Sequence, residues 1–145
     1  MDMEKEKSTD VNKNLQEKPD FRLFDAKGKI LGRLATEIAV FLNGKDKVNF
    51  DPSKDNRNWA IVINSDKVRL SAEKAKKKIY WRFSGYPGGI YKRTFEEMMA
   101  VDSRKVIEKA VKGMLPKNKL SSEKLKRLRV FVDEKNTYSK EFISK

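Results

Sequence analysis

One run of consecutive apolar residues, Trp59–Ile63, constrains the fold of this chain more than any other part of its sequence. An uninterrupted apolar run of this length is typical of a strand that is covered on both faces within a parallel sheet. The strands of a parallel sheet must be joined by crossover segments, which are usually helices. The run therefore predicts an α/β domain rather than an all-helical or an antiparallel one.

The flanking sequence supplies the strands and helices that such a sheet requires. Apolar side chains at helical spacing after Gly32 end at Gly44, and glycine commonly ends helices. Thr94 and Glu97 form the capping-box signature of another helix start. Further strands are expected at 21–25, 67–70, 79–83 and 128–132, and further helices at 71–78, from 103 to Gly113 and at 121–127. This succession predicts a three-layer α/β/α domain with a mainly parallel sheet.

The chain of 145 residues has the length of one domain, and a domain of this size buries about 70% of the surface of its unfolded form. We expect a disordered extension over residues 1–20, which hold few apolar side chains and more acids than bases. The folded domain is expected over residues 21–132, followed by a polar tail over 133–145. Because the extension is acidic, the basic character of the chain belongs to its folded part.

Basic residues dominate the charge of the chain, with 34 Lys and Arg against 21 Asp and Glu and a formal net charge of +13. Such a positive field favours polyanionic partners, of which nucleic acid is the first candidate and an anionic membrane the second. No apolar run approaches the roughly 18 residues of a membrane-spanning helix. We therefore expect a nucleic-acid partner and no membrane.

The residue types that are missing argue against catalysis. The sequence contains no cysteine and no histidine. Disulfides, thiolate nucleophiles, cysteine-based zinc sites and histidine general bases are thereby excluded. The glycine-rich phosphate loop and the dinucleotide-binding fingerprint are also missing. We expect no enzymatic activity, no metal, no cofactor and no small-molecule substrate.

The segment 113–119 is the first candidate for contact with a polyanion. The expected helix ends at Gly113, Pro116 prevents the chain from re-entering it, and three side-chain donors follow at Lys117–Lys119. A stiff basic loop of this kind suits a phosphate backbone. The alternative interpretation is a solvated helix end with ordinary surface lysines.

A second candidate is the glycine-rich loop Gly85–Gly89. Its glycines let the main chain approach a ligand closely, and Tyr86 offers a ring on which a base can stack. Arg82, Lys92 and Arg93 flank the loop. Basic residues interleaved with aromatic ones favour RNA, and a plain turn is the alternative.

Other basic clusters allow both a functional and a structural interpretation. Lys45 and Lys47 follow the end of a helix, where they would also interact favourably with the helix dipole. The runs Lys74–Lys78 and Lys124–Arg129 are more typical of a solvated face than of a contact site. Several such clusters on one small domain strengthen the RNA interpretation.

Taken together, these segments resemble the bacterial-type large-subunit ribosomal protein L-thirteen family over residues 21–132. The matching segments are Asp25–Ala35, Leu42–Lys47, Ile61–Asn64, Ser84–Gly89 and Glu108–Asn118. The resemblance implies a three-layer fold around a four-stranded parallel sheet, no enzymatic activity, and binding to large-subunit rRNA during early assembly. It also implies neighbouring ribosomal proteins as partners and a location in the cytoplasmic ribosome. Residues 133–141 depart from the family pattern, so the path of the tail is not predicted.

We expect lysines and arginines to neutralise rRNA phosphates while the two Gly/Pro loops fit folded RNA by shape. The expected RNA-contacting residues are Arg33, Lys45, Lys47, Arg82, Ser84, Tyr86, Gly88, Gly89, Lys92, Arg93, Lys112, Lys117, Asn118, Lys119, Lys126, Arg127 and Arg129. One alternative is a free regulatory RNA- or mRNA-binding protein, which would use the same chemistry. Another is a nucleotide-using or RNA-modifying enzyme, which only the fold class favours.

Overall fold

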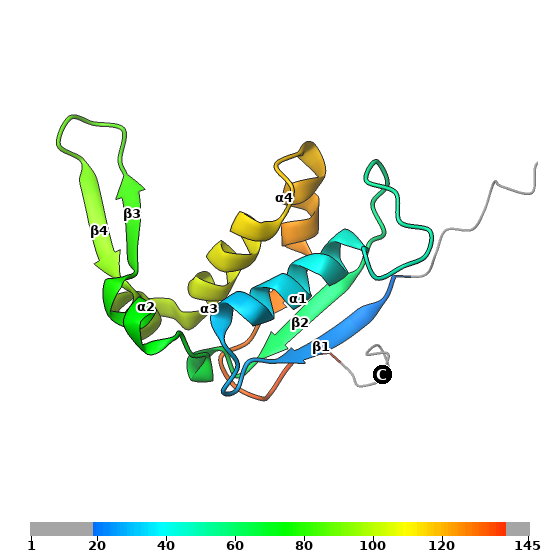
Figure 1. Ribbon diagram of the computed structural model, residues 1–145, viewed down its shortest axis with the longest axis horizontal. Helices are drawn as coiled ribbons and strands as arrows, with labels where there is room; N and C mark the ends of the chain where they lie inside the picture. The colour runs from blue at the N-terminus through cyan, green and yellow to red at the C-terminus, as the bar shows by residue number, and fades with distance from the viewer. Residues whose placement is uncertain (1–18, 139–145) are drawn as a thin grey trace, which may run out of the picture.

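The computed structural model describes residues 19–138, and a parallel three-stranded sheet forms its centre (Figure 1). Strand β1 (Phe21–Asp25) pairs with β2 (Trp59–Ile63), which pairs on its other side with β5 (Leu128–Val130). Residues 60–63 of the central strand are buried. The prediction of a covered strand in a parallel sheet, drawn from the apolar run, is confirmed.

Helices α1 (Leu31–Asn43), α3 (Phe95–Met114) and α4 (Lys119–Lys126) lie on one face of this sheet (Figure 1). The strand order β1-β2-β5 means that both crossovers step in the same direction. Since parallel crossovers are right-handed, both connections place their helices on the same face. The expected three-layer arrangement, with helices on both faces, is therefore wrong for the described residues. Two layers of helix and sheet form the core, in which the apolar side of α1 packs against Phe24 and Val62.

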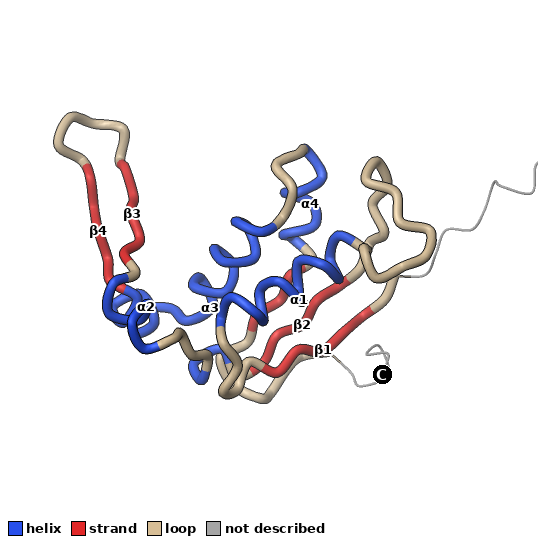
Figure 2. The backbone as a smooth tube through the Cα atoms, viewed as in Figure 1, coloured by secondary structure: helices blue, strands red, loops and turns tan. Residues whose placement is uncertain are grey.

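The expected four-stranded parallel sheet is also wrong for the part of the chain that the structure describes. Strand β3 (Ile79–Phe83) pairs antiparallel with β4 (Ile90–Thr94) in a separate hairpin that projects from the body (Figure 2). The aromatic segment 79–83 is thus a strand, as expected, but in another sheet. The segment 67–70 contributes a single bridge between Ile30 and Arg69 instead of a strand. Helix α2 (Ala72–Lys77) precedes the hairpin.

An aromatic cluster lies on the sheet face away from the helices. Phe21 stacks on Trp59 with ring centroids 5.8 Å apart, and Tyr138 lies 6.5 Å from Trp59. The tail therefore turns back toward the sheet, a path that its sequence did not reveal. The predicted disordered extension lies, up to residue 18, outside the described residues, as does the tail beyond residue 138.

The ends of α3 show which sequence signals act as expected. Thr94 and Glu97 form the predicted capping box, with the backbone N–H of Glu97 donating to Oγ1 of Thr94 at 3.3 Å. The expected stop at Gly113 is wrong, because the helix continues to Met114. Leu115 is extended, as the residue before a proline must be to avoid a clash with its ring. Pro116 therefore ends the helix, and Gly113 requires another explanation.

Gly44 ends α1 in the left-handed conformation, with φ of 76°. A Cβ at this position would lie 1.7 Å from Nδ2 and 2.8 Å from Cγ of Asn56, a residue of the loop that leads to β2. We expect Gly44→Ala to lower the free energy of unfolding by about 2 kcal/mol, from backbone strain and this clash. Urea denaturation measures the change. In a double-mutant cycle with Asn56→Ala, the double variant should lose less than the sum of the single variants, and strict additivity would contradict the contact.

Candidate nucleic-acid interface

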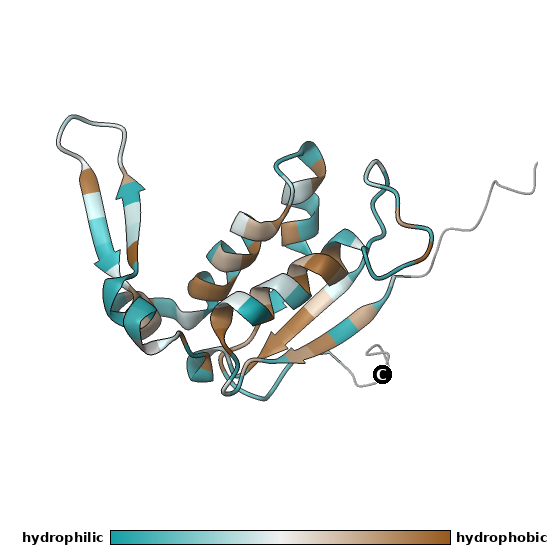
Figure 3. Cartoon of the chain, in the orientation of Figure 1, coloured by the Kyte–Doolittle hydropathy of each residue, from teal (hydrophilic) through white to brown (hydrophobic). Residues whose placement is uncertain are grey.

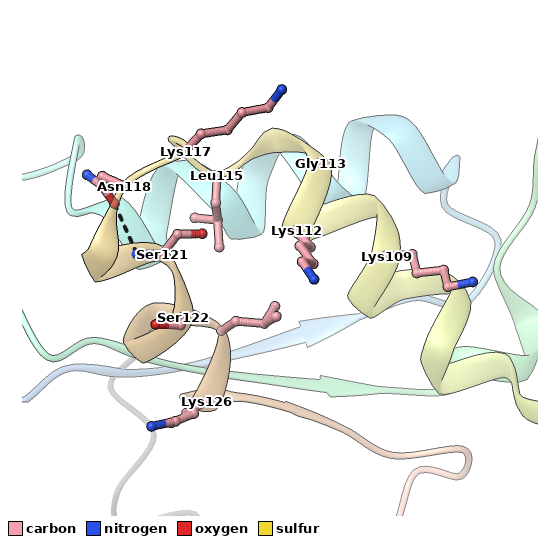
Figure 4. Close-up of a pocket in the computed structure, with 10 residues that line it drawn as sticks. Lys109, Lys112, Gly113, Leu115, Lys117, Asn118, Ser121, Ser122 and Lys126 are labelled. Atoms are coloured by element: carbon pink, nitrogen blue, oxygen red, sulfur yellow. Dashed lines mark hydrogen bonds between the residues drawn. The ribbon is translucent and has the colours of Figure 1, made fainter. Parts of the chain in front are cut away.

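An open cleft of about 720 Å³ lies between the end of α3 and α4 (Figure 4). The lining includes the apolar residues Leu115 and Leu125 and the hydroxyls of Ser121 and Ser122. Four lysines surround this lining, namely Lys109, Lys112, Lys117 and Lys126. None of the described residues that line the cleft is acidic. A surface with this charge and shape can accept an anionic ligand that also has an apolar part.

The shape of the cleft follows from how the chain turns between the two helices. Pro116 keeps Leu115 extended, and Asn118 begins α4 by accepting a hydrogen bond from the backbone N–H of Ser121 at 3.0 Å (Figure 4). This capping contact occupies the Asn118 carbonyl oxygen and leaves its amide NH2 able to donate. The backbone at Lys117 lies in the turn between the two helices, and its exposed side chain points outward at the rim of the cleft (Figure 4). The backbone that carries the predicted donors at 117–119 therefore has a defined path.

A second hollow joins Lys45 to the same region. It is lined by the end of α1, by Lys45 from the following loop, and by Met114 and Pro116 at the end of α3. Lys45 and Lys117 are 72 residues apart in the sequence, yet both lie beside Pro116. The structure therefore brings two of the predicted clusters together.

Helix α4, which forms one wall of the cleft, is held in place by a buried lysine. Lys124 is 1% exposed, and its Nζ donates to Oδ1 of Asn43 in α1 at 2.5 Å. Burial lowers the pKa of Lys124 from its ordinary value, and the nearby Asp55 carboxylate partly opposes this effect. Arg127, at the end of α4, is paired with Asp55 and has a side chain that is 13% exposed. These contacts fasten α4 to α1 and to the loop before β2.

The hairpin forms a separate basic surface. In its register, Tyr80 is opposite Arg93 and Arg82 is opposite Tyr91, so these four side chains share one face. The other face carries Trp81 opposite Lys92 and Phe83 opposite Ile90. The side chains other than Tyr80 are exposed, Trp81 at 64%. Both strands of the hairpin carry hydrophobic and hydrophilic residues (Figure 3).

The loop at the tip of the hairpin is closed by its glycines. Gly85 and Gly88 have positive φ values of 89° and 73°. A Cβ on Gly89 would lie 1.9 Å from Oγ of Ser84, and the backbone N–H of Ser84 donates to the Gly89 carbonyl at 2.9 Å. These contacts give Ser84, Gly88 and Gly89 a structural role in the turn. Tyr86, 76% exposed, remains available at the tip.

Comparison with known proteins connects this geometry to one family. The sequence profile described as ribosomal protein L13 matches residues 19–137. The chain belongs to the ribosomal protein L13 family. Its relatives include the large ribosomal subunit protein uL13 of Laribacter hongkongensis, 46% identical over 84% of this chain and 86% of the relative. The protein of the same name from Thermus thermophilus is 47% identical over 80% of this chain and 83% of the relative.

Several predicted contact residues of this L13-family chain have partners within the protein. Lys47 lies 3.3 Å from a carboxylate oxygen of Asp20, and Lys126 lies 2.8 Å from that of Glu123. Arg129 lies over the ring of Trp59, on the face of the sheet away from the cleft. Arg33 is exposed on α1 and lines neither the cleft nor the hollow at Lys45.

Lys109 is a cleft residue that the predicted site lacked. Its Nζ lies 5.2 Å from the centre of the Tyr80 ring, so it stands between the cleft and the base of the hairpin. Its spacing of three residues from Lys112 on one helix was the available signal. Lys124 was expected on a solvated face as part of the run Lys124–Arg129, but it is buried. Its spacing of four residues from Leu120 was the available signal, because that spacing puts both residues on one side of a helix. Within residues 19–138, no helix is both long and apolar enough to span a bilayer.

Proposed function

We propose that this L13-family chain is a structural constituent of the large ribosomal subunit that binds large-subunit rRNA and supports early assembly of the subunit. Relatives that are 46–47% identical to it over the aligned residues carry the name large ribosomal subunit protein uL13. The family is structural rather than catalytic, which agrees with a sequence that has no histidine and no cysteine. The protein acts in the cytoplasmic ribosome.

One observation carries the rRNA proposal. The cleft between α3 and α4 presents four lysines around an apolar floor, and none of its described lining residues carries a carboxylate. Lysine ammonium groups neutralise phosphates and release counterions, a contribution that dominates non-specific affinity for nucleic acids. In this proposal Lys112, Lys117 and Lys119 contact phosphates, and Asn118 donates to a sugar or phosphate oxygen.

The hairpin supplies the second proposed contact. Arg82 and Arg93 on one face and Lys92 on the other would contact phosphates, while the exposed ring of Tyr86 would meet a sugar or a base. The hairpin projects from the body, so it can reach a part of the RNA that the cleft does not (Figure 1). Its exposed apolar side chains also support neighbouring ribosomal proteins as further partners.

Removing charge from the cleft loop tests the proposal. We expect Lys117→Gln/Lys119→Gln to weaken binding to a large-subunit rRNA transcript about tenfold near 100 mM salt and to reduce the salt slope by about two. Filter binding at several salt concentrations measures both values. The matched control is Lys54→Gln/Lys135→Gln, which removes the same charge from exposed residues outside both surfaces. An equal loss in both variants would contradict a defined contact at the loop.

Sedimentation separates this proposal from a free regulatory RNA-binding protein. A constituent of the large subunit should remain with that subunit in a sucrose gradient after a high-salt wash, at one copy per particle. A regulatory protein would appear in the light fractions. The gradient is therefore the direct test of the location.

A further inference from the structure

Gly113 has no function in the fold that the structure reveals. It lies within α3, one residue before the last helical residue, and it is exposed. Its backbone does not have the positive φ found at Gly28, Gly44, Gly85 and Gly88. Apart from its chain neighbours and the nearby backbone of its own helix, a Cβ built on it would have no heavy atom within 4 Å. Glycine within a helix is destabilising relative to alanine, so the chain retains an unfavourable residue where alanine would fit.

The position of Gly113 suggests what it serves. It lines the cleft between α3 and α4, next to Lys112 and close to Leu115 (Figure 4). A residue without a side chain lets a ligand approach the helix backbone more closely than any other residue allows. The free space at Gly113 is therefore part of the volume that a ligand in the cleft can use.

The chemistry of the cleft favours one kind of ligand. The surrounding lysines, with no acidic residue among the described lining residues, complement a polyanion. A bare phosphate would have no use for the partly exposed apolar side chain of Leu125, which a ribose or a base can cover. The volume of about 720 Å³ lies within the range of about 300–1,000 Å³ that is usual for ligand pockets.

We infer that Gly113 keeps open a nucleotide subsite, in which one nucleotide of the bound RNA lies against the backbone of α3. Its apolar face covers Leu125, and its flanking phosphates lie among the cleft lysines. This inference rests on the proposed binding of rRNA. It adds a steric requirement to what is otherwise an attraction between charges.

Two substitutions at one position test the inference. Gly113→Ala should bind a large-subunit rRNA transcript about tenfold more weakly, because its methyl group occupies the subsite. Gly113→Lys adds a positive charge to the cleft, so simple electrostatic attraction predicts tighter binding. If the subsite exists, Gly113→Lys should instead bind at least as weakly as Gly113→Ala, because its side chain also occupies the subsite. Both variants should melt at or above the temperature of the unaltered protein, because both residues favour helix more than glycine does.

Gly32→Ala is the matched control, since Gly32 also lies in a helix with no heavy atom within 4 Å of a Cβ and lies outside the cleft. Its affinity should not change. Unchanged affinity of Gly113→Ala, tighter binding of Gly113→Lys, or a lower melting temperature of Gly113→Ala would each overturn the inference. The salt slope of the unaltered protein reports separately on the proposed function. A normal slope with tolerant Gly113 variants would leave rRNA binding intact and remove only the subsite.

Discussion

Raising the salt concentration from 50 to 200 mM is expected to weaken binding of this chain to large-subunit rRNA by about three orders of magnitude, if about six phosphates are neutralised. The six residues proposed to contact phosphates are Lys112, Lys117, Lys119, Arg82, Lys92 and Arg93. Each contact releases counterions into solution, and that release becomes less favourable as salt is added. Steep salt dependence is therefore the signature of this mode of binding.

The measurement is a plot of log affinity against log salt concentration for the isolated protein and an rRNA transcript. Arg82→Gln/Arg93→Gln should reduce the slope by about two, as should the pair of substitutions at Lys117 and Lys119. Because the hairpin and the cleft loop are separate surfaces, the two reductions should add. A flat plot for the unaltered protein would contradict the proposed contacts as a whole.

Replacing Asn43 by leucine is expected to destabilise the fold by about 3 kcal/mol, because it leaves the buried amine of Lys124 without its hydrogen-bond acceptor. Lys124→Met should change stability little or raise it, since it removes the charge and keeps an apolar chain of similar length. Equilibrium urea denaturation measures both changes. Equal destabilisation by the two substitutions would show that the hydrogen bond itself, rather than the buried charge, sets the stability.

The pH dependence of stability gives a second readout of the same lysine. Because burial lowers the pKa of Lys124 in the folded state, the unfolded chain binds its proton more tightly. The contribution of Lys124 to the free energy of unfolding should therefore increase with pH, up to the ordinary lysine pKa of about 10.4. The difference in free energy of unfolding between the unaltered protein and Lys124→Met, measured between about pH 7 and pH 10, isolates this contribution. A difference that does not vary with pH would contradict the lowered pKa.

The parts of the fold that the sequence predicted correctly are those set by neighbouring residues. The buried strand Trp59–Ile63, the stop at Gly44 and the capping box at Thr94 each depend on a few consecutive side chains. The number of parallel strands was wrong because sheet membership depends on contacts between distant segments. Nothing within Ile79–Phe83 distinguishes a strand of a central sheet from a strand of an exposed hairpin. The placement of helices on one face follows from the strand order, which is likewise non-local.

The candidate site was predictable to a similar degree. Lys117 and Lys119 beside Pro116 stand out in the sequence as a stiff basic loop. The proximity of Lys45 to that loop depends on how α1 packs on α3, so no sequence pattern could reveal it. Gly113 was expected to end a helix, which made its actual position inside the helix impossible to interpret before the structure was known.

The contact of Tyr138 with Trp59 has a consequence for how the chain is made. A ribosome synthesises all strands of the domain before it reaches Tyr138, so the rings of Phe21 and Trp59 leave the exit tunnel well before this residue can cover them. Until then the nascent chain carries an uncovered aromatic surface, which is the kind of surface that chaperones bind. The aromatic cluster is therefore completed only after residue 138 has left the tunnel.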